Sequence, residues 1–186
     1  MNFKTKENTA LLVIDMQKGF DDPKWGIRNN LQAESNIAQI IELWRAKSRP
    51  VIHIQHCSTE ADSPLRLGQS GVEFKPEAEP HVGEVIFQKS VNSAFIGTSL
   101  ESHLKNEGIH QLVITGLTTD HCVSTTTRMA GNLGFDVLLV SDATATFNRK
   151  GVDGKEHSAE EIFEIHLASL NDEFCQVVTA QSLLSS

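Results

Sequence analysis

Three side chains that could perform covalent chemistry each follow a short apolar run of the sequence. Asp15, Lys89 and Cys122 come just after such runs, and each run is bounded by turn residues, a pattern typical of strands. If the sheet is parallel, the carboxyl ends of its strands meet at one edge, where ligands bind. A carboxylate, an ammonium and a thiol gathered there predict a cysteine nucleophile with a proton acceptor and a stabilising positive charge.

Cys122 is the expected nucleophile because it follows a strand, a polar turn at 118–120 and the start of a predicted helix. The unpaired N–H groups and the macrodipole at a helix start favour a thiolate over a thiol. The same N–H groups could also stabilise an oxyanion. The alternative is that Cys122 is a small buried apolar residue, a common environment for a free cysteine.

Composition excludes several classes of protein. The 186 residues, 39% hydrophobic and 22% charged, suit one globular domain spanning residues 1–186. The net charge of −8 and the absence of a basic stripe argue against a nucleic-acid partner. The brief apolar run near the N-terminus contains Asp15, so we expect neither a signal peptide nor a membrane span, and a cytoplasmic protein.

The cysteines do not form a structural framework. Cys57, Cys122 and Cys175 are odd in number and widely spaced, which favours reduced thiols over disulfides or structural zinc. A thiol redox role for Cys122 would require Cys57 to approach it in space.

Strands and helices alternate along the chain. Helices are expected around 37–44 and after Cys122 as far as Gly131 or Gly134. Two more helices should each begin with a capping box, the first formed by Thr98 and Glu101 and the second by Ser158 and Glu161. The expected strands are 10–14, 51–55, 84–88, 112–114, 137–140 and 176–179. This order predicts an α/β fold, a three-layer α/β/α sandwich around a parallel sheet with right-handed crossovers.

One irregular segment and three aromatic residues are candidates for the substrate pocket. Residues 57–83 lack periodicity and are too long for an ordinary connection, so we expect a lid or a pocket wall. Phe20, Trp25 and Phe147 are candidate pocket residues, although the first two could instead pack under their loop or at a subunit interface. Residues 148–157, charged and containing glycine, are expected to form a mobile surface loop.

The histidines do not suggest a metal site or a catalytic dyad. His53 and His56 are three residues apart on a strand, so period-two alternation places them on opposite faces, where they cannot easily share an ion. His121 is adjacent to Cys122, and neighbouring helical residues point about 100° apart, a poor geometry for a dyad.

Four motifs give the sequence a family resemblance: VIDMQKGF, FQKSVNSAF, VITGLTTDHCV and LLVSDAT. Over most of its length the chain resembles the isochorismatase-like cysteine hydrolases, which include nicotinamidases and N-carbamoylsarcosine amidohydrolases. The resemblance implies a catalytic triad of Asp15, Lys89 and Cys122. It also implies a Rossmann-like, six-stranded parallel sheet in the order 3-2-1-4-5-6, and a homodimer or larger homo-oligomer.

The resemblance also implies a mechanism of acyl transfer. A cis peptide is expected at Leu117–Thr118, and the backbone N–H groups of Thr118 and Cys122 would form the oxyanion hole. The metal-binding Asp-x-His of nicotinamidases is missing from HIQHCSTEADSPLR, so we expect no metal and no cofactor. The predicted function is metal-independent hydrolysis of a C–N bond in a small amide, carbamoyl compound or lactam through a thioester. The alternatives are a vinyl-ether hydrolase of the isochorismatase type and a non-catalytic protein that binds a small ligand.

Overall fold

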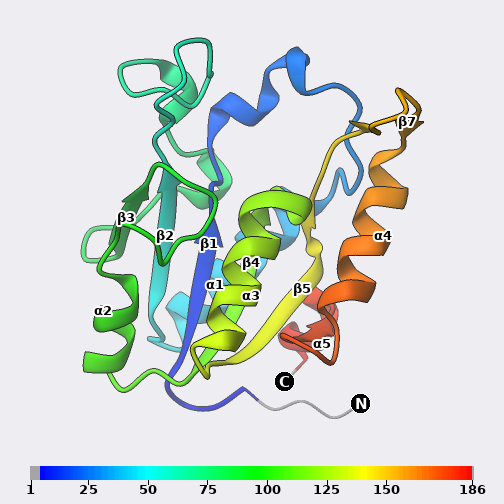
Figure 1. The fold of residues 1–186 in the computed structure, drawn as a ribbon. Helices are drawn as coiled ribbons and strands as arrows, with labels where there is room; N and C mark the ends of the chain where they lie inside the picture. The colour runs from blue at the N-terminus through cyan, green and yellow to red at the C-terminus, as the bar shows by residue number, and fades with distance from the viewer. Residues whose placement is uncertain (1–4, 186) are drawn as a thin grey trace.

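The computed structural model describes residues 5–185, which form a parallel six-stranded sheet with helices on both faces (Figure 1). The strand order is β3-β2-β1-β4-β5-β8. The strands are β1 (Thr9–Ile14), β2 (Val51–His56), β3 (Val85–Lys89), β4 (Gln111–Leu117), β5 (Asp136–Ala145) and β8 (Gln176–Val178). The predicted fold is confirmed. The sixth strand is labelled β8 because a small antiparallel hairpin, β6 (Arg149–Lys150) and β7 (Glu156–His157), precedes it.

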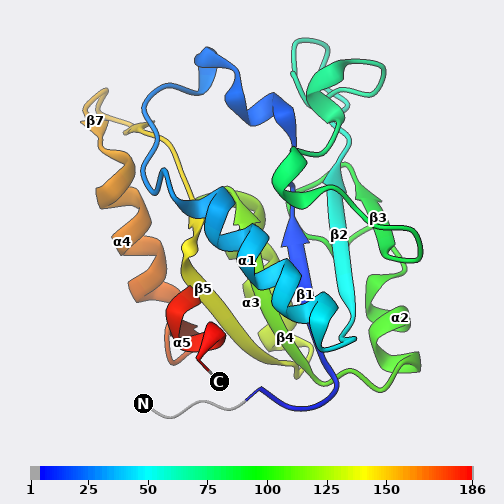
Figure 2. The ribbon, with the colours of Figure 1, turned by 180° about the vertical axis from the view of Figure 1, so that it is seen from behind.

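In the part of the chain that the structure describes, five α-helices cover the sheet. They are α1 (Ala33–Ala46), α2 (Leu100–Asn106), α3 (Ser124–Asn132), α4 (Ala159–Leu170) and α5 (Ala180–Leu184). Helices α2, α3 and α4 lie on one face, and α1 and α5 lie on the other, as the view from behind shows (Figure 2). Between residues 5 and 185, no helix is long and apolar enough to cross a lipid bilayer.

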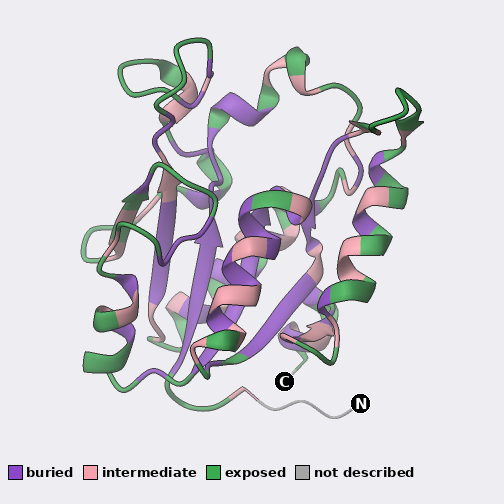
Figure 3. Ribbon diagram, viewed as in Figure 1, coloured by how far each residue is buried: buried purple, intermediate pink, exposed green. Residues whose placement is uncertain are grey.

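Two apolar cores result from the alternation of side chains along the strands. In β1, Leu11 and Val13 pack toward α1, whereas Leu12 and Ile14 pack toward α2 and α3, and all four are fully buried. A strand covered on both faces is apolar throughout, which explains the continuous run 10–14. In Figure 3 the central strands β1 and β4 are buried throughout, the edge strand β3 is partly exposed, and the helices are exposed on their outer faces.

The two predicted capping boxes and the predicted loop at 148–157 had different outcomes. The capping box of Ser158 and Glu161 at the start of α4 is confirmed. The box expected at Thr98 is wrong, because α2 begins after Ser99 and the Thr98 hydroxyl donates to the Ala94 carbonyl at 2.6 Å. The segment expected as a loop at 148–157 contains the β6–β7 hairpin.

Gly116 permits the close approach of β4 to β1. It is the register partner of Ile14, and a Cβ atom at Gly116 would lie 2.0 Å from the Ile14 carbonyl oxygen. Its φ of 120° is also unfavourable for any other residue. The small residue therefore sets the spacing between the strands that carry Asp15 and lead to Cys122.

We expect Gly116→Ala to lower the free energy of unfolding by at least about 2 kcal/mol, because backbone atoms cannot yield as a flexible side chain can. Denaturant unfolding measures the change. Gly134→Ala is the matched control, because Gly134 also has a positive φ, 86°, but no atom within 4 Å of the added Cβ. Its cost should be about 1–2 kcal/mol, from the left-handed backbone alone. Equal losses in the two variants would contradict a role for strand spacing.

Candidate active site

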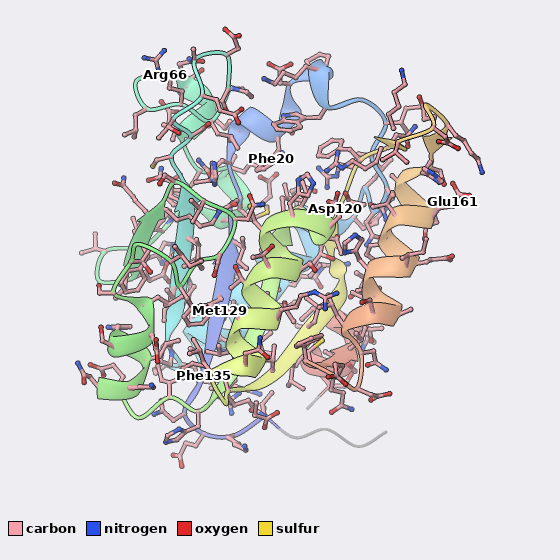
Figure 4. The ribbon with its side chains drawn as sticks, in the orientation of Figure 1. Phe20, Arg66, Asp120, Met129, Phe135 and Glu161 are labelled. Atoms are coloured by element: carbon pink, nitrogen blue, oxygen red, sulfur yellow. The ribbon has the colours of Figure 1, made fainter. Side chains whose placement is uncertain are left out.

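The three predicted site residues meet at the carboxyl edge of the sheet. The Nζ atom of Lys89 lies 2.6 Å from Asp15 Oδ2 and 3.2 Å from Cys122 Sγ. Asp15 follows β1, Lys89 ends β3, and Cys122 lies in the turn after β4. All three are buried, with exposures of 0%, 2% and 6%. Figure 4 shows Phe20 and Asp120, from the neighbouring connections, at this same edge, whereas Phe135 lies toward the other end of the sheet.

The backbone at Asp15 turns sharply where β1 ends. Asp15 has a φ of 50°, in the left-handed region that aspartate tolerates better than most residues. Its N–H donates to the Ile54 carbonyl at 2.9 Å, and its carbonyl accepts from the Gln17 N–H at 2.8 Å. These bonds hold the residue in its turn beside β2.

Cys122 lies in one turn of π-helix, Thr119–Val123, that leads into α3. The peptide Leu117–Thr118 just before this turn is cis. The Asp120 carboxylate, almost completely buried, accepts from Arg149 Nε at 2.7 Å and from Thr146 Oγ1 at 2.5 Å. Burial disfavours its charge, but these donors outweigh burial and lower the pKa of Asp120. The turn that carries the thiol is thereby tied to the segment after β5.

The surroundings of Cys122 favour the thiol over the thiolate, contrary to the expectation from the helix start. Burial, and then the negative charge of Asp15, raises the pKa of Cys122, and Lys89 only partly offsets this. Burial also disfavours the Lys89 ammonium, but Asp15 and Cys122 outweigh it and raise the pKa of Lys89. The surroundings therefore favour the charged form of Lys89 and the neutral form of Cys122.

One oxygen of the Asp15 carboxylate is free. Oδ2 accepts from Lys89, whereas Oδ1 is buried and has no hydrogen-bond partner among the described residues. An unsatisfied buried oxygen is uncommon and costs stability unless it has another role. A carboxylate oxygen of Asp15 lies within 4.8 Å of Cys122 Sγ, so the group is placed to accept the proton of the thiol.

A cavity of about 90 Å³ opens beside the thiol. Its residues form an apolar wall and a polar wall, and they are Phe20, Trp25, Leu65, His56, Asn92, Thr118, His121 and Cys122. Ligand sites for drug-sized molecules are typically about 300–1,000 Å³, so this cavity suits a much smaller molecule. Thr118 and Cys122, the two residues expected to form an oxyanion hole, both line it.

The three predicted aromatic residues form one cluster. The ring of Phe20 lies 5.3 Å from that of Trp25 and 6.4 Å from that of Phe147, centroid to centroid. Phe20 and Trp25 line the cavity, but Phe147 does not. It is buried and stacks on the other two, so it supports the apolar wall without facing the cavity.

His56 belongs to the site although the sequence interpretation set it aside. Its Nδ1 atom lies 3.0 Å from Lys89 Nζ. His53, by contrast, is fully buried and contacts Glu84 at 2.8 Å. The two histidines therefore occupy different environments. The sequence predicted that they lie on opposite faces of the strand, but not that His56 contacts Lys89. The signal that could have found His56 is its place at the carboxyl end of β2, beside Lys89 at the end of β3.

Distance alone would allow a cation between Asp15, His56 and Cys122, since one donor atom of each lies within 4.8 Å of the others. The ammonium of Lys89 already lies there, 2.6, 3.0 and 3.2 Å from the three donor residues. A metal ion would have to displace this positive charge or be repelled by it. The residues do not fit a catalytic metal, and the predicted absence of a metal site remains a prediction that this geometry supports.

The sequence and the fold match a known family. The family model described as the isochorismatase domain matches residues 9–182. The chain belongs to the isochorismatase family. The protein is thus an isochorismatase-family hydrolase, as the resemblance of its motifs implied.

Individual relatives agree with this assignment. The isochorismatase family protein YrdC of Bacillus subtilis is 51% identical over 180 residues, which cover 97% of this chain and 96% of YrdC. A solved isochorismatase-family structure from Chromobacterium violaceum has a TM-score of 0.95 at 45% identity and covers 98% of this chain and 94% of that one. The ureidoacrylate amidohydrolase RutB of Pantoea ananatis is 27% identical over 175 residues, covering 75% of this chain and 70% of RutB.

We expect Lys89→Met to lower the free energy of unfolding of this hydrolase by about 3–5 kcal/mol, because it leaves the buried Asp15 carboxylate without its cation. The double variant Asp15→Asn/Lys89→Met should lose less, since both charges are removed together. Urea unfolding of the two variants and the wild type tests this. If the double variant is as unstable as Lys89→Met, the Asp15–Lys89 pair is not the source of the loss.

Proposed function

We propose that the protein is a metal-independent cysteine hydrolase that cleaves a C–N bond of a small amide, carbamoyl compound or lactam through a thioester. The observation that carries the proposal is the buried Asp15 carboxylate, with a carboxylate oxygen within 4.8 Å of Cys122 Sγ and with Oδ1 accepting no hydrogen bond from another described residue. A proton acceptor and a nucleophile next to one small cavity are the parts that acyl transfer needs. The amidohydrolase RutB among the relatives supports C–N chemistry.

Acylation begins with the proton of the thiol. In this proposal Asp15 accepts that proton as Cys122 attacks the carbonyl carbon, so the thiolate forms only when substrate is in place. Lys89 keeps its bond to Asp15 Oδ2 and stabilises the negative sulfur. The backbone N–H groups of Thr118 and Cys122 then stabilise the tetrahedral oxyanion, each worth about 10²–10³ in rate in comparable sites.

Collapse of the tetrahedral intermediate releases the amine. Asp15, now protonated, gives its proton to the leaving nitrogen, and the acyl group remains on Cys122 as a thioester. A water molecule that loses a proton to Asp15 then attacks the thioester carbonyl. The carboxylic acid leaves, the thiol recovers its proton, and the resting charges are restored.

We expect Cys122→Ala to reduce turnover by about 10³-fold or more, because it removes the nucleophile. The measurement is a screen of small amides, carbamoyl compounds, lactams and a vinyl ether for ammonia release and product mass, with intact-protein mass after acid quench to detect an acyl group on Cys122. Cys175→Ala is the matched control and should stay within about twofold of wild type. Cys175 lies outside the cavity, and burial raises its pKa to about 12.

Other outcomes of the screen separate the alternatives. Turnover that persists in Cys122→Ala would sink the cysteine mechanism. Cleavage of a vinyl ether without ammonia release would support isochorismatase-type chemistry instead. No turnover of any compound, together with tight binding that Cys122→Ala leaves intact, would support a ligand-binding protein.

A further inference from the structure

The backbone of His56 is held in place from two sides. Gln17 accepts from the His56 N–H at 2.8 Å and donates to the His56 carbonyl at 2.9 Å. His56 and Lys89 are register partners on β2 and β3, and the next N–H, of Cys57, donates to the Lys89 carbonyl at 2.7 Å. The backbone that carries the His56 ring is therefore fixed beside Lys89.

The contact with Lys89 determines where the ring of His56 carries its proton. An ammonium has three donors and no acceptor, so at 3.0 Å from Lys89 Nζ the Nδ1 atom of His56 must be the acceptor. The proton of the neutral ring is then on Nε2. Burial, and then the charge of Lys89, lowers the pKa of His56, against the weaker opposing charges of Asp15 and Glu60. The ring is thus a neutral donor through Nε2.

The Nε2–H of His56 is free to bind substrate. Across residues 5–185 it makes no hydrogen bond, and it is not among the polar atoms that are buried without a partner. His56 lines the same cavity as Cys122. A donor on this wall of a cavity of about 90 Å³ is close enough to reach substrate atoms next to the reacting carbonyl, whose own oxygen is expected at Thr118 and Cys122.

We propose that His56 is a positioning residue whose Nε2–H donates to a second acceptor atom of the substrate, one or two carbons from the scissile carbonyl. This inference rests on the proposed function and narrows its substrate class. The preferred substrate is a small amide with a hydroxyl or a second carbonyl near the C–N bond, held against Phe20 and Trp25. A simple aliphatic amide of the same size leaves the His56 donor unpaired and binds more weakly.

The first test reads the proton on the ring and needs no substrate. Two-dimensional ¹⁵N–¹H spectra of histidine side chains, with the signals of His56 assigned by their loss in His56→Asn, are recorded from pH 6 to 8. The proposal expects the neutral ring to carry its proton on Nε2, with the ring neutral at pH 8. A neutral ring with its proton on Nδ1, or a ring still charged at pH 8, would overturn it.

The second test measures binding in the Cys122→Ala background, where no thioester can form. Dissociation constants from NMR titration are compared for two isosteric pairs, malonamide with isovaleramide and lactamide with isobutyramide. The first member of each pair carries the second acceptor and should bind about tenfold more tightly, the effect of one hydrogen bond. Equal affinities within both pairs would overturn the proposal.

Two further variants in that background assign the preference to one nitrogen of His56. His56→Asn offers an amide near the position of Nδ1 but nothing at Nε2, and should abolish the preference. His56→Gln can place an amide N–H near Nε2, and should retain most of it. A preference that survives in His56→Asn would contradict the assignment. If the preference holds but wild-type protein hydrolyses no amide, the proposed function fails while the role of His56 in binding stands.

Discussion

The ammonium of Lys89 is the interaction on which the site depends. Its side chain is fully buried, and an unpaired charge in such a place would cost several kcal/mol. It persists because partners from three other segments lie within 3.2 Å of it: Asp15, His56 and Cys122. The left-handed turn at Asp15 and the glycine at 116 matter because they bring these partners within hydrogen-bond distance.

The sequence predicted the three principal site residues because parallel strands impose a simple rule. Each strand that is covered on both faces is an apolar run with one carboxyl end, so Asp15, Lys89 and Cys122 could be assigned to one edge before any coordinates. The same rule places His56 at this edge, directly after the expected strand 51–55, but it was considered only as a metal ligand shared with His53. Its contact with Lys89 also depends on the pairing register of β2 with β3, which apolar runs do not encode. The raised pKa of Cys122 was missed for a similar reason, since burial depends on packing across the whole edge.

A predicted capping box formed only where no tertiary contact competed for its side chain. The capping box at Ser158 formed at an exposed helix start, whereas the Thr98 hydroxyl binds the Ala94 carbonyl in the loop that follows β3. Phe147 was predicted as a pocket residue together with Phe20 and Trp25, but it stacks on both rings without lining the cavity. Which ring faces the cavity depends on the path of the chain after β5, which the sequence does not reveal. Residues 57–83 supply one wall residue, Leu65, and two 3-10 turns that periodicity could not predict.

The separation of the site residues along the chain has a consequence for biogenesis. Lys89 is 74 residues from Asp15 and 33 from Cys122 in sequence. Contacts between such distant residues form only after the intervening chain has been ordered, and their closure slows folding. A nascent or partly folded chain therefore holds its cysteine without the ammonium and carboxylate beside it. The three side chains can meet only once β3, β2, β1 and β4 have paired in this order, so a chain that lacks this pairing has no assembled site.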